Sequence, residues 1–405
     1  MGHAVRDGRP DARAAVMLSA LAIANYRSLR EVIVPLGALN IVTGPNGSGK
    51  SSVYRALRLL AQTARGGVIG ALAREGGLPS TLWAGPERFA RAMLTGDMPV
   101  QGTGRREPVN LRLGFASDTF SYAIDLGLPA IQPSETAFAL DPVIKRECIW
   151  SGSLLRPSAL LVDRQGVSIR TRGNGGEWQT IPQPVASFDS MMTEFSDPRT
   201  APEMIAVREQ IRSWRFHDHF RTDSEAPVRL PQIGTHTPVL SDDGADLAAA
   251  LQTIREIGDA VALDAAIEDA FPGSRVSIAS LEGRFELTMR QHGLLRPLKG
   301  AELSDGTLRY LLLVAALLTP RPPALLVLNE PETSLHPDLL LALARLIAQA
   351  ARHSQVVVVS HAARLIAALE CENGSRSIVL EKELGATRIA GADELDIPPW
   401  KWPAR

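Results

Sequence analysis

The sequence predicts an α/β fold in which a parallel sheet carries a phosphate-binding loop and a large α+β segment is inserted. Three observations predict this fold. Residues 44–52 form a glycine-rich loop directly after the β-branched run 39–43. Residues 324–328 and 355–359 are almost continuously apolar, as is typical of strands buried on both faces. Between about residues 105 and 190, apolar and polar residues alternate, which indicates antiparallel strands.

The glycine-rich loop reads Gly44-Pro45-Asn46-Gly47-Ser48-Gly49-Lys50-Ser51-Ser52 and fits the spacing G-x-x-x-x-G-K-[ST]. Gly44 and Gly49 let the backbone turn tightly, so that amide groups can approach a phosphate. The helical pattern that starts at Lys50 adds the positive end of a helix dipole. In such a loop the lysine reaches the β- and γ-phosphates, and the hydroxyl of Ser51 ligates Mg²⁺. We therefore predict a nucleoside triphosphate site.

Length, composition and charge are those of a soluble globular protein. The 405 residues are 45% hydrophobic and 21% charged, with a net charge of −1, so no overall positive charge points to nucleic acid. No run of about 18 apolar residues exists, so we expect no membrane contact. Cys148 and Cys371 lack metal-binding spacing, which fits a reducing compartment and a cytoplasmic location. We expect residues 1–16 to be a disordered extension.

Between the loop and the last third, the pattern predicts two strands near the N-terminus, at 17–23 and 31–36, followed by a long insertion. Residues 66–294 are assigned to this inserted α+β arm. Its part 105–190 is mainly antiparallel strand, and its part 200–270 is mainly helix. Residues 244–270 have the spacing of one helix, opened by a cap at 241–243. A hairpin is expected around Glu282-Gly283.

The last third of the chain supplies two more polar strand ends. The apolar run 324–328 ends at Asn329-Glu330, and the run 355–359 ends at Ser360-His361. Ligands of parallel sheets bind beyond the carboxyl ends of the strands, so these groups should converge on the loop at 44–52. There Glu330 could polarise an attacking water and His361 could hydrogen-bond the γ-phosphate. The alternatives are a helix N-cap role for Glu330 and a packed loop histidine for His361.

Four motifs in this order resemble the head of an ABC-type ATPase. They are the loop 44–51, the segment 303–307 (LSDGT), the strand end at Glu330, and Ser360-His361. The sequence is most similar to the non-transporter branch with the SMC, RecF-like and OLD-type ATPases, whose first-strand motif resembles residues 25–28. The resemblance implies that residues 17–65 and 295–390 form the head and that 391–405 form a C-terminal tail.

The resemblance also implies a mechanism. Residues 44–52, with Arg27, would bind ATP; Lys50, Glu330 and His361 would be catalytic, with Glu330 as the base. Mg²⁺ would be held by Ser51 and, weakly or through water, by Asn329. Ser304 and Gly306 would bind the γ-phosphate of ATP held by a second subunit, so that a homodimer encloses the nucleotide and hydrolyses it.

The sequence departs from the pattern of this family at several positions. Asn329 replaces the usual aspartate, so metal affinity and turnover should be low. Asp305 replaces the usual signature glycine, residues 334–336 lack the usual D-loop aspartate, and Gln101 is a guess for the Q-loop. The insert lacks heptads for a long coiled coil. The chain after His361 is too short for a nuclease domain, so any nuclease would be a separate protein.

Three functions are compatible with these features. The first is an ATPase that dimerises on ATP and acts on a partner protein or on DNA, with a repair or defence role by family analogy. The second is a nucleotide-dependent binding module with little hydrolysis, because of Asn329. The third is the ATP-binding subunit of a transporter, which an insert of about 230 residues disfavours.

Two weaker signals lie in the insert. Residues 216–220 (FHDHF) could be a metal site, but a polar loop is the preferred interpretation. Arginines interspersed with acids predict a solvated face, with a DNA or partner surface as the alternative; they are Arg208, Arg212, Arg215, Arg221 and Arg229.

Overall fold

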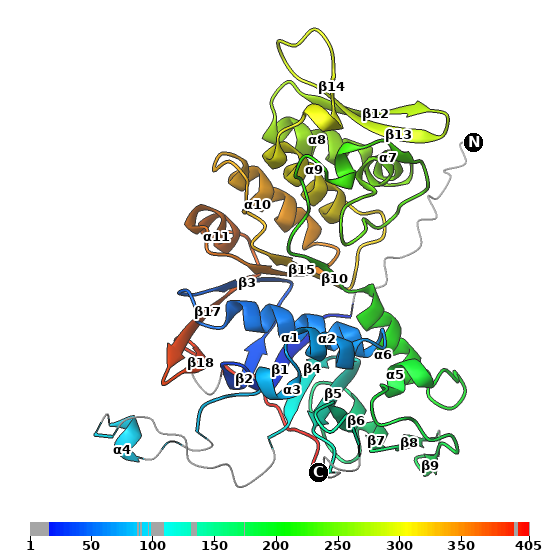
Figure 1. The fold of residues 1–405 in the computed structure, drawn as a ribbon, viewed down its shortest axis with the longest axis vertical. Coiled ribbons are helices and arrows are strands. Elements are labelled where there is room, and N and C mark those ends of the chain that lie inside the picture. The colour runs from blue at the N-terminus through cyan, green and yellow to red at the C-terminus, as the bar shows by residue number, and fades with distance from the viewer. Residues whose placement is uncertain are drawn as a thin grey trace, which may run out of the picture.

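The computed structural model describes residues 16–86, 89, 91–95, 97–98, 109–130, 136–173, 175–392 and 396–404. The expected extension up to residue 15 and Gln101 lie outside these ranges. The described residues form three sheets with their helices (Figure 1). Within the described ranges, no helix has both the length and the apolar character needed to cross a membrane.

A mainly parallel sheet crosses the middle of the molecule in the order β10-β15-β16-β3-β17-β18 (Figure 1). Only β18 is antiparallel to its neighbour. The expected strands at 39–43, 324–328 and 355–359 are confirmed, whereas β10, β17 and β18 were not expected. The bounds are β3 Leu39–Thr43, β10 Arg215–His217, β15 Leu325–Asn329, β16 Gln355–Val359, β17 Ser375–Glu383 and β18 Ala386–Ile389.

Each face of this sheet is covered by its own hydrophobic core. In β16, for example, Val357 and Val359 belong to one core and Val356 and Val358 to the other. The same alternation holds in β15, where Leu325 and Val327 face one core and Leu326 and Leu328 the other. Burial on both faces explains why these strands are apolar at nearly every position.

The first core lies between the central sheet and an eight-stranded antiparallel sheet in the order β2-β1-β4-β5-β6-β7-β8-β9. The strand β1 is buried almost throughout and pairs with β2 on one edge and β4 on the other. Strands β4 to β9 therefore continue the sheet that the N-terminal strands begin; the division into head and arm remains a prediction. The bounds are β1 Leu18–Tyr26, β2 Leu29–Pro35, β4 Leu111–Ser117, β5 Phe120–Gly127, β6 Val143–Ser151, β7 Leu160–Gln165, β8 Ser168–Arg172 and β9 Trp178–Thr180.

Helices of the N-terminal half lie on the side of the central sheet that also carries the eight-stranded antiparallel sheet (Figure 1). Helix α1 follows the glycine-rich loop and buries its apolar side in the first core. The bounds are α1 Lys50–Thr63, α2 Val68–Arg74, α3 Leu78–Thr81, α4 Arg91–Leu94, α5 Met191–Glu194 and α6 Pro202–Ser213. The C-terminal tail returns to the antiparallel sheet, where the ring of Trp400 lies 5.5 Å from that of Trp150.

The second core contains the remaining helices and a small sheet (Figure 1). The expected hairpin around Glu282-Gly283 is confirmed as β12 and β13. The remaining bounds are α7 Leu247–Ile257, α8 Ala260–Ala270, α9 Asp305–Leu317, α10 Leu339–Ala350, α11 Ala363–Glu370, β11 Gln232–Ile233, β12 Arg275–Leu281, β13 Arg284–Arg290, β14 Leu298–Lys299, and the 3₁₀ turns Pro227–Arg229 and Gly300–Glu302.

The single helix expected over 244–270 is wrong. Gly258 ends α7, and the side chain of Asp259 caps α8 by accepting a hydrogen bond from the amide of Ala262 at 2.8 Å. As a result, Ile257 and Val261 leave the helical stripe and are 58% and 80% exposed. The capping aspartate outweighed the apolar spacing on which the expectation rested.

Candidate functional site

The three polar strand ends lie side by side at one edge of the central sheet. Strand β16 lies between β15 and β3. The amide of Glu330 donates to the carbonyl of Val359 at 2.8 Å, and the amide of Ser360 donates to the carbonyl of Val42 at 3.2 Å. The glycine-rich loop, His361 and Glu330 therefore extend from three adjacent strands.

Two glycines of the loop are required by the packing around it. Gly44 and Gly49 have φ values of 139° and 113°. A Cβ on Gly44 would lie 2.1 Å from the carbonyl oxygen of Leu380, and one on Gly49 would lie 2.4 Å from Oγ1 of Thr387. Both approaches are far shorter than a van der Waals contact, so no side chain fits at either position.

Thr387 of β18 contacts the glycine-rich loop and stabilises its backbone. Its Oγ1 lies 2.7 Å from the carbonyl oxygen of Ser48 and 2.8 Å from Oγ of Ser28, at the turn between β1 and β2. This contact joins three segments that are far apart in the chain. Sequence reasoning missed Thr387 because nothing in its local pattern indicates the loop.

Lys50 lies at the start of α1 and is buried. Its Nζ donates to the carbonyl oxygens of Gly44 at 2.6 Å and Pro45 at 3.0 Å. Within the described ranges, no carboxylate forms an ion pair with this ammonium group. Neutral carbonyl oxygens therefore hold the ammonium group inside the loop. Its positive charge is not neutralised by a carboxylate among the described residues and is available to an anion bound in the loop.

Oxygen atoms near the loop fit a magnesium ion. In the described part of the chain, Oδ1 of Asn329 and Oγ of Ser48 are buried and have no hydrogen-bond partner. Such orphaned groups require an explanation, and a bound ion or its water shell provides one. Mg²⁺ takes oxygen ligands, keeps several waters and needs few protein groups. The Asn329 amide can act as a neutral ligand or bind one of these waters, with Ser51 exposed at the start of α1.

Glu332 organises the loop that carries His361, and sequence reasoning missed it. Its buried Oε1 accepts hydrogen bonds from Oγ of Ser360 at 2.7 Å and from the amides of His361 and Ala362 at 3.0 and 3.2 Å. Nδ1 of His361 lies 3.4 Å from the same oxygen. A carboxylate that accepts several bonds fixes the loop backbone and orients the imidazole. The only signal was a second acid two residues after Glu330.

Arg309 was also missed. It lies in α9 among apolar residues, is buried, and donates to the carbonyl of Asp218 at 3.2 Å. Burial lowers the pKa of Arg309, and the nearby carboxylates of Glu332, Asp218 and Glu330 oppose this shift. The guanidinium therefore places a positive charge between α9 and the acids that follow β15. An arginine within an otherwise apolar helix was the available signal.

Arg27 is paired with an acid in this structure. Its guanidinium forms an ion pair with Glu75 at 2.5 Å, and the hydroxyl of Tyr26 donates to the same carboxylate at 2.8 Å. Burial, followed by the hydrogen bond to Glu75, raises the pKa of Tyr26. The neighbouring Ser28, rather than Arg27, contacts Thr387 beside the loop. The nucleotide-binding role of Arg27 remains a prediction.

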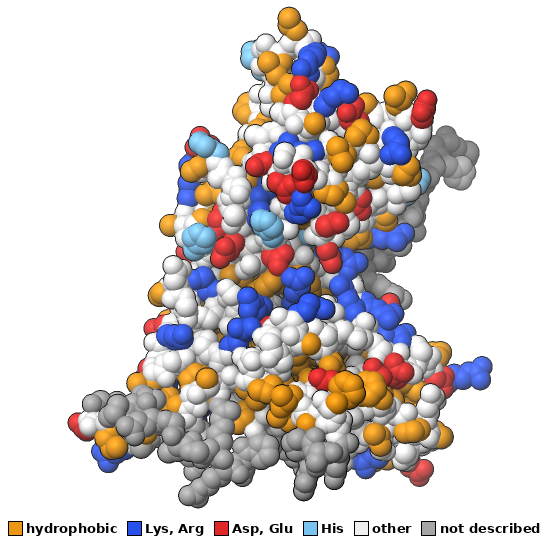
Figure 2. All heavy atoms as spheres, in the orientation of Figure 1, with side chains coloured by type: hydrophobic (Ala, Val, Ile, Leu, Met, Phe, Trp, Pro, Cys, Tyr) orange, Lys and Arg blue, Asp and Glu red, His pale blue; other side chains and the backbone are white. Residues whose placement is uncertain are grey.

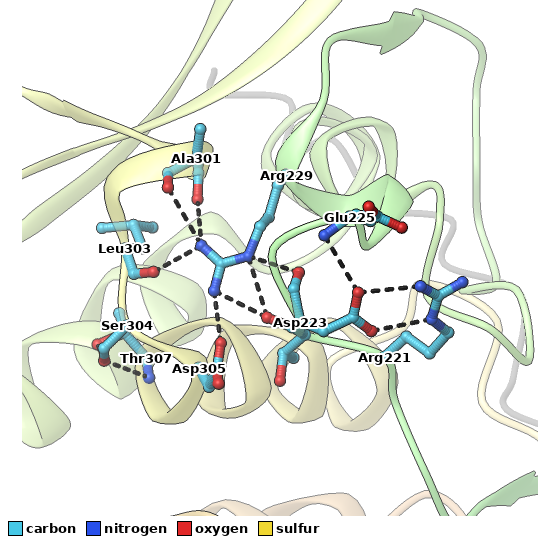
Figure 3. Close-up of polar contacts among 11 residues, drawn as sticks. Arg221, Asp223, Glu225, Arg229, Ala301, Leu303, Ser304, Asp305 and Thr307 are labelled. Atoms are coloured by element: carbon cyan, nitrogen blue, oxygen red, sulfur yellow. Dashed lines mark hydrogen bonds and ion pairs between the residues drawn. The ribbon is translucent and has the colours of Figure 1, made fainter.

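The segment LSDGT opens α9 on the surface. Ser304 is the N-cap of α9, and its exposed side chain accepts a hydrogen bond from the amide of Thr307 at 3.2 Å (Figure 3). A Cβ on Gly306 would lie 2.9 Å from the carbonyl oxygen of Ser334, so this helix start packs tightly on the loop after β15. Ser304 therefore faces outward, where a second molecule can reach it.

Not all of the arginines in the insert belong to a solvated face. The side chain of Arg229 is only 9% exposed, and Arg215 is half-buried. Burial lowers the pKa of Arg215. The expectation is wrong for these two residues because backbone carbonyls, which a sequence pattern does not reveal, solvate their guanidinium groups.

The segment 216–220 is a loop only from residue 218 onward, so the expectation of a polar loop is wrong for its first half. Arg215–His217 is the edge strand β10, and His217 is buried and stacked 5.2 Å from Phe220. No cluster of three or more metal-ligating side chains was found in the described ranges. Burial lowers the pKa of His217 to about 4, which makes it a neutral core histidine.

The buried His217 predicts loss of stability in acid. Its pKa rises from about 4 in the folded protein to about 6.5 on unfolding, so the unfolded chain binds the extra proton between these values. The free energy of unfolding should therefore fall by about 2 kcal/mol from pH 7 to pH 5 through this residue. In a His217→Phe variant this part of the pH dependence should disappear in denaturant titrations. An unchanged pH dependence would contradict the assignment.

The parallel sheet, the glycine-rich loop and the adjacent strand ends define the chain as a P-loop ATPase head. A family model described as "AAA domain, putative AbiEii toxin, Type IV TA system" matches residues 39–367, which is well over half of the chain. The chain belongs to this family. The predicted resemblance to SMC, RecF-like and OLD-type ATPases and the predicted fold class are confirmed.

The chain is also similar to individual proteins with the SMC and OLD names. Over 44 residues the chain is 43% identical to an OLD nuclease of Thermus scotoductus (strain ATCC 700910 / SA-01), a match that covers 11% of this chain and 8% of that protein. An SMC head bound to the C-terminal winged-helix domain of ScpA matches with a TM-score of 0.50 and 13% identity, covering 92% of this chain and 97% of the other. A Pyrococcus furiosus SMC head with an extended coiled coil, bound to the C-terminal domain of ScpA, matches with a TM-score of 0.47 and 11% identity, covering 92% of this chain and 96% of the other. At 13% identity, the match with a TM-score of 0.50 indicates a shared fold and nothing beyond it.

Proposed function

We propose that the protein binds ATP with Mg²⁺ in the glycine-rich loop, hydrolyses it between two copies of the chain, and uses the engaged state to act on a partner protein. The observation that supports this proposal is the adjacency of the three strand ends from which the loop, Glu330 and His361 extend. Groups brought together by separate segments in this way are the hallmark of a ligand site in a parallel sheet.

Different residues of the chain would bind the phosphates, hold Mg²⁺ and activate the attacking water. Amides of the loop and the ammonium of Lys50 bind the phosphates, and Lys50 leaves the carbonyls of Gly44 and Pro45 to do so. Mg²⁺, held by Ser51 and Asn329, would neutralise charge on the phosphates. Glu330 accepts the proton of the attacking water, and His361, oriented by Glu332, donates to the γ-phosphate.

The second copy completes the site. The side chain of Ser304 is exposed, and the first amides of α9 form a helix N-terminus, which favours an anion. We therefore place them against the γ-phosphate of ATP held by the other copy. This arrangement makes hydrolysis depend on dimerisation, and it lets the two states of the dimer signal to a partner, including a separately encoded nuclease.

The dimer can be tested directly. With Mg²⁺ and the non-hydrolysable analogue adenylyl imidodiphosphate, sedimentation equilibrium is expected to show a dimer, whereas ADP should leave a monomer. The reason is that only the nucleotide with a γ-phosphate reaches Ser304 of the other copy. A monomer with both nucleotides at micromolar protein would rule out the two-copy mechanism.

Binding of nucleic acid is a second candidate function. Around a cavity of about 340 Å³ beside α1 lie Arg55, Arg58 and Arg74. Lys and Arg side chains gather over α1 in the middle of this face (Figure 2). Arg58 is paired with Asp218 at 2.9 Å, but no acid within the described ranges is paired with Arg55 or Arg74. Exposed, uncompensated guanidinium groups suit phosphodiester contacts.

These arginines predict how the affinity for DNA depends on salt concentration. If they bind DNA phosphates, the variant Arg55→Gln/Arg74→Gln should weaken binding about tenfold or more and reduce the slope of log K against log salt by about 2. Fluorescence anisotropy with labelled duplex DNA measures both. The matched control is Arg321→Gln/Arg352→Gln, at the opposite edge of the central sheet. Equal slopes for the two double variants would exclude this surface.

A further inference from the structure

Arg229 fastens the start of α9 to the segment before it. Its Nη1 donates to the carbonyl oxygen of Leu303 at 2.7 Å, and its Nε and Nη2 donate to that of Thr222 at 3.0 and 2.8 Å (Figure 3). Nε also donates to the carbonyl of Asp223 at 2.9 Å, and Nη1 also donates to that of Ala301 at 3.2 Å. The guanidinium is thus enclosed by main-chain oxygens from two segments that are far apart in sequence.

One carboxylate completes this arrangement. Nη2 of Arg229 lies 2.5 Å from Oδ1 of Asp305, the first residue of α9, between Ser304 and Gly306 (Figure 3). The two partners differ in accessibility: the side chain of Arg229 is 9% exposed and that of Asp305 is 58% exposed. The arginine is therefore enclosed by the main chain, and the aspartate is the solvent-facing member of the pair.

The position of Asp305 conflicts with the role of its neighbours. A phosphate that meets Ser304 and the first amides of α9 would approach a carboxylate on the same helix turn. Two anions at one helix N-terminus repel each other, and both are attracted by the same dipole and the same guanidinium. In the free protein, the carboxylate of Asp305 occupies the guanidinium of Arg229 and the N-terminus of α9, which are the positive groups that the incoming phosphate would need.

We propose that Arg229 positions the LSDGT loop and that Asp305 is a built-in competitor for the phosphate of the second copy's nucleotide, so that it holds back ATP-driven dimerisation. This inference rests on the proposed function. Engagement requires Asp305 to turn into solvent, and Nη2 of Arg229 is then free to donate to the arriving phosphate. Arg229 and Asp305 are positioning and gating residues, respectively, with no part in the bond-breaking step.

The variant Asp305→Asn tests the gate. It keeps the shape of the side chain and removes its charge, so the dissociation constant of the dimer with Mg²⁺ and adenylyl imidodiphosphate should fall about fivefold to tenfold. The gain should shrink as salt is raised from 50 to 500 mM, because the carboxylate of Asp305 is 58% exposed and salt screens its repulsion of the phosphate. The matched control is Asp223→Asn, which removes an acid from the same neighbourhood and leaves the carbonyl that Arg229 uses.

A purely structural role for Asp305 gives a different result. An acid in the first turn stabilises a helix, so Asp305→Asn should lower the melting temperature slightly. If Asp305 only supported the fold, dimerisation would weaken together with stability. The gate predicts changes of opposite sign, a less stable monomer and a tighter dimer. Arg229→Gln should loosen the loop and weaken the dimer, with circular dichroism as the check on folding.

The outcomes separate this inference from the function on which it rests. A tighter dimer for Asp305→Asn than for the wild type and for Asp223→Asn supports the gate. Dimers of equal strength for the wild type and both variants overturn the gate and leave the two-copy mechanism intact. If none of the proteins dimerises with the analogue, both proposals are wrong.

Discussion

The variant Glu330→Gln is expected to hydrolyse ATP at least about 100-fold more slowly than the wild type and to bind it with similar affinity, because a general base contributes 10² to 10⁴ in rate. Glutamine has the same length and tolerates the backbone equally, which matters because Glu330 has a left-handed φ of 49°. It can still hydrogen-bond the water, but it cannot take its proton. ATP-bound dimers should therefore accumulate.

Phosphate release and sedimentation with ATP measure these two effects. Glu177→Gln, an exposed acid in the loop before β9, is the matched control and should behave as the wild type. Activity of Glu330→Gln within about threefold of the wild type would show that another group is the base. If the wild type itself releases no more phosphate than Lys50→Ala, the protein is a nucleotide-dependent binding module, which is the alternative that Asn329 favours.

The variant Lys50→Ala should lose ATP affinity by at least about 100-fold. Hydrogen bonds to a charged group contribute about 1.5–3 kcal/mol each, and Lys50 can offer two or more to the β- and γ-phosphates. Since about 1.4 kcal/mol corresponds to a factor of ten, two bonds account for the expected loss. The fold should persist, because the neutral acceptors of Lys50 lie in the exposed loop, where water can replace it.

Isothermal titration with Mg²⁺ and the analogue measures this affinity. Lys382→Ala, an exposed position of β17, removes the same charge outside the loop and should have no effect. Comparable affinity of Lys50→Ala and the wild type would place the nucleotide elsewhere on the protein.

Local patterns were sufficient for the strands and the loop of the site. These features consist of consecutive residues: a glycine-rich loop with a lysine, and apolar runs that end in polar residues. They placed β3, β15 and β16 correctly because burial on both faces forces nearly every position to be apolar. The same reasoning failed where a cap interrupted a regular spacing, as between α7 and α8.

Residues that support the site were not predictable in this way. Thr387, Glu332 and Arg229 act through contacts with backbone groups of other segments. Backbone carbonyls and amides are the same in every sequence, so no pattern indicates which of them a side chain will meet. Arg229 illustrates the point, because it was grouped with surface arginines and yet is enclosed by carbonyl oxygens.

The departures from the family pattern also become interpretable only in three dimensions. Asp305 stands in place of the usual signature glycine, and the structure gives this residue a partner in Arg229. Asn329 in place of an aspartate suggested weak metal binding, and its side-chain oxygen is buried without a partner among the described residues. Both substitutions lie where the nucleotide would be held, and their effect depends on neighbours that the sequence does not reveal.

Mixing two inactive variants tests the central claim, a site composed of two copies, most directly. Lys50→Ala cannot hold ATP but keeps Ser304, while Ser304→Asp keeps the cap of α9 and repels a phosphate. In an equimolar mixture about half of the dimers are mixed, and each of these has one complete site, so phosphate release should recover to about a quarter of the wild-type rate. A mixture no more active than the mean of its two components would contradict the account.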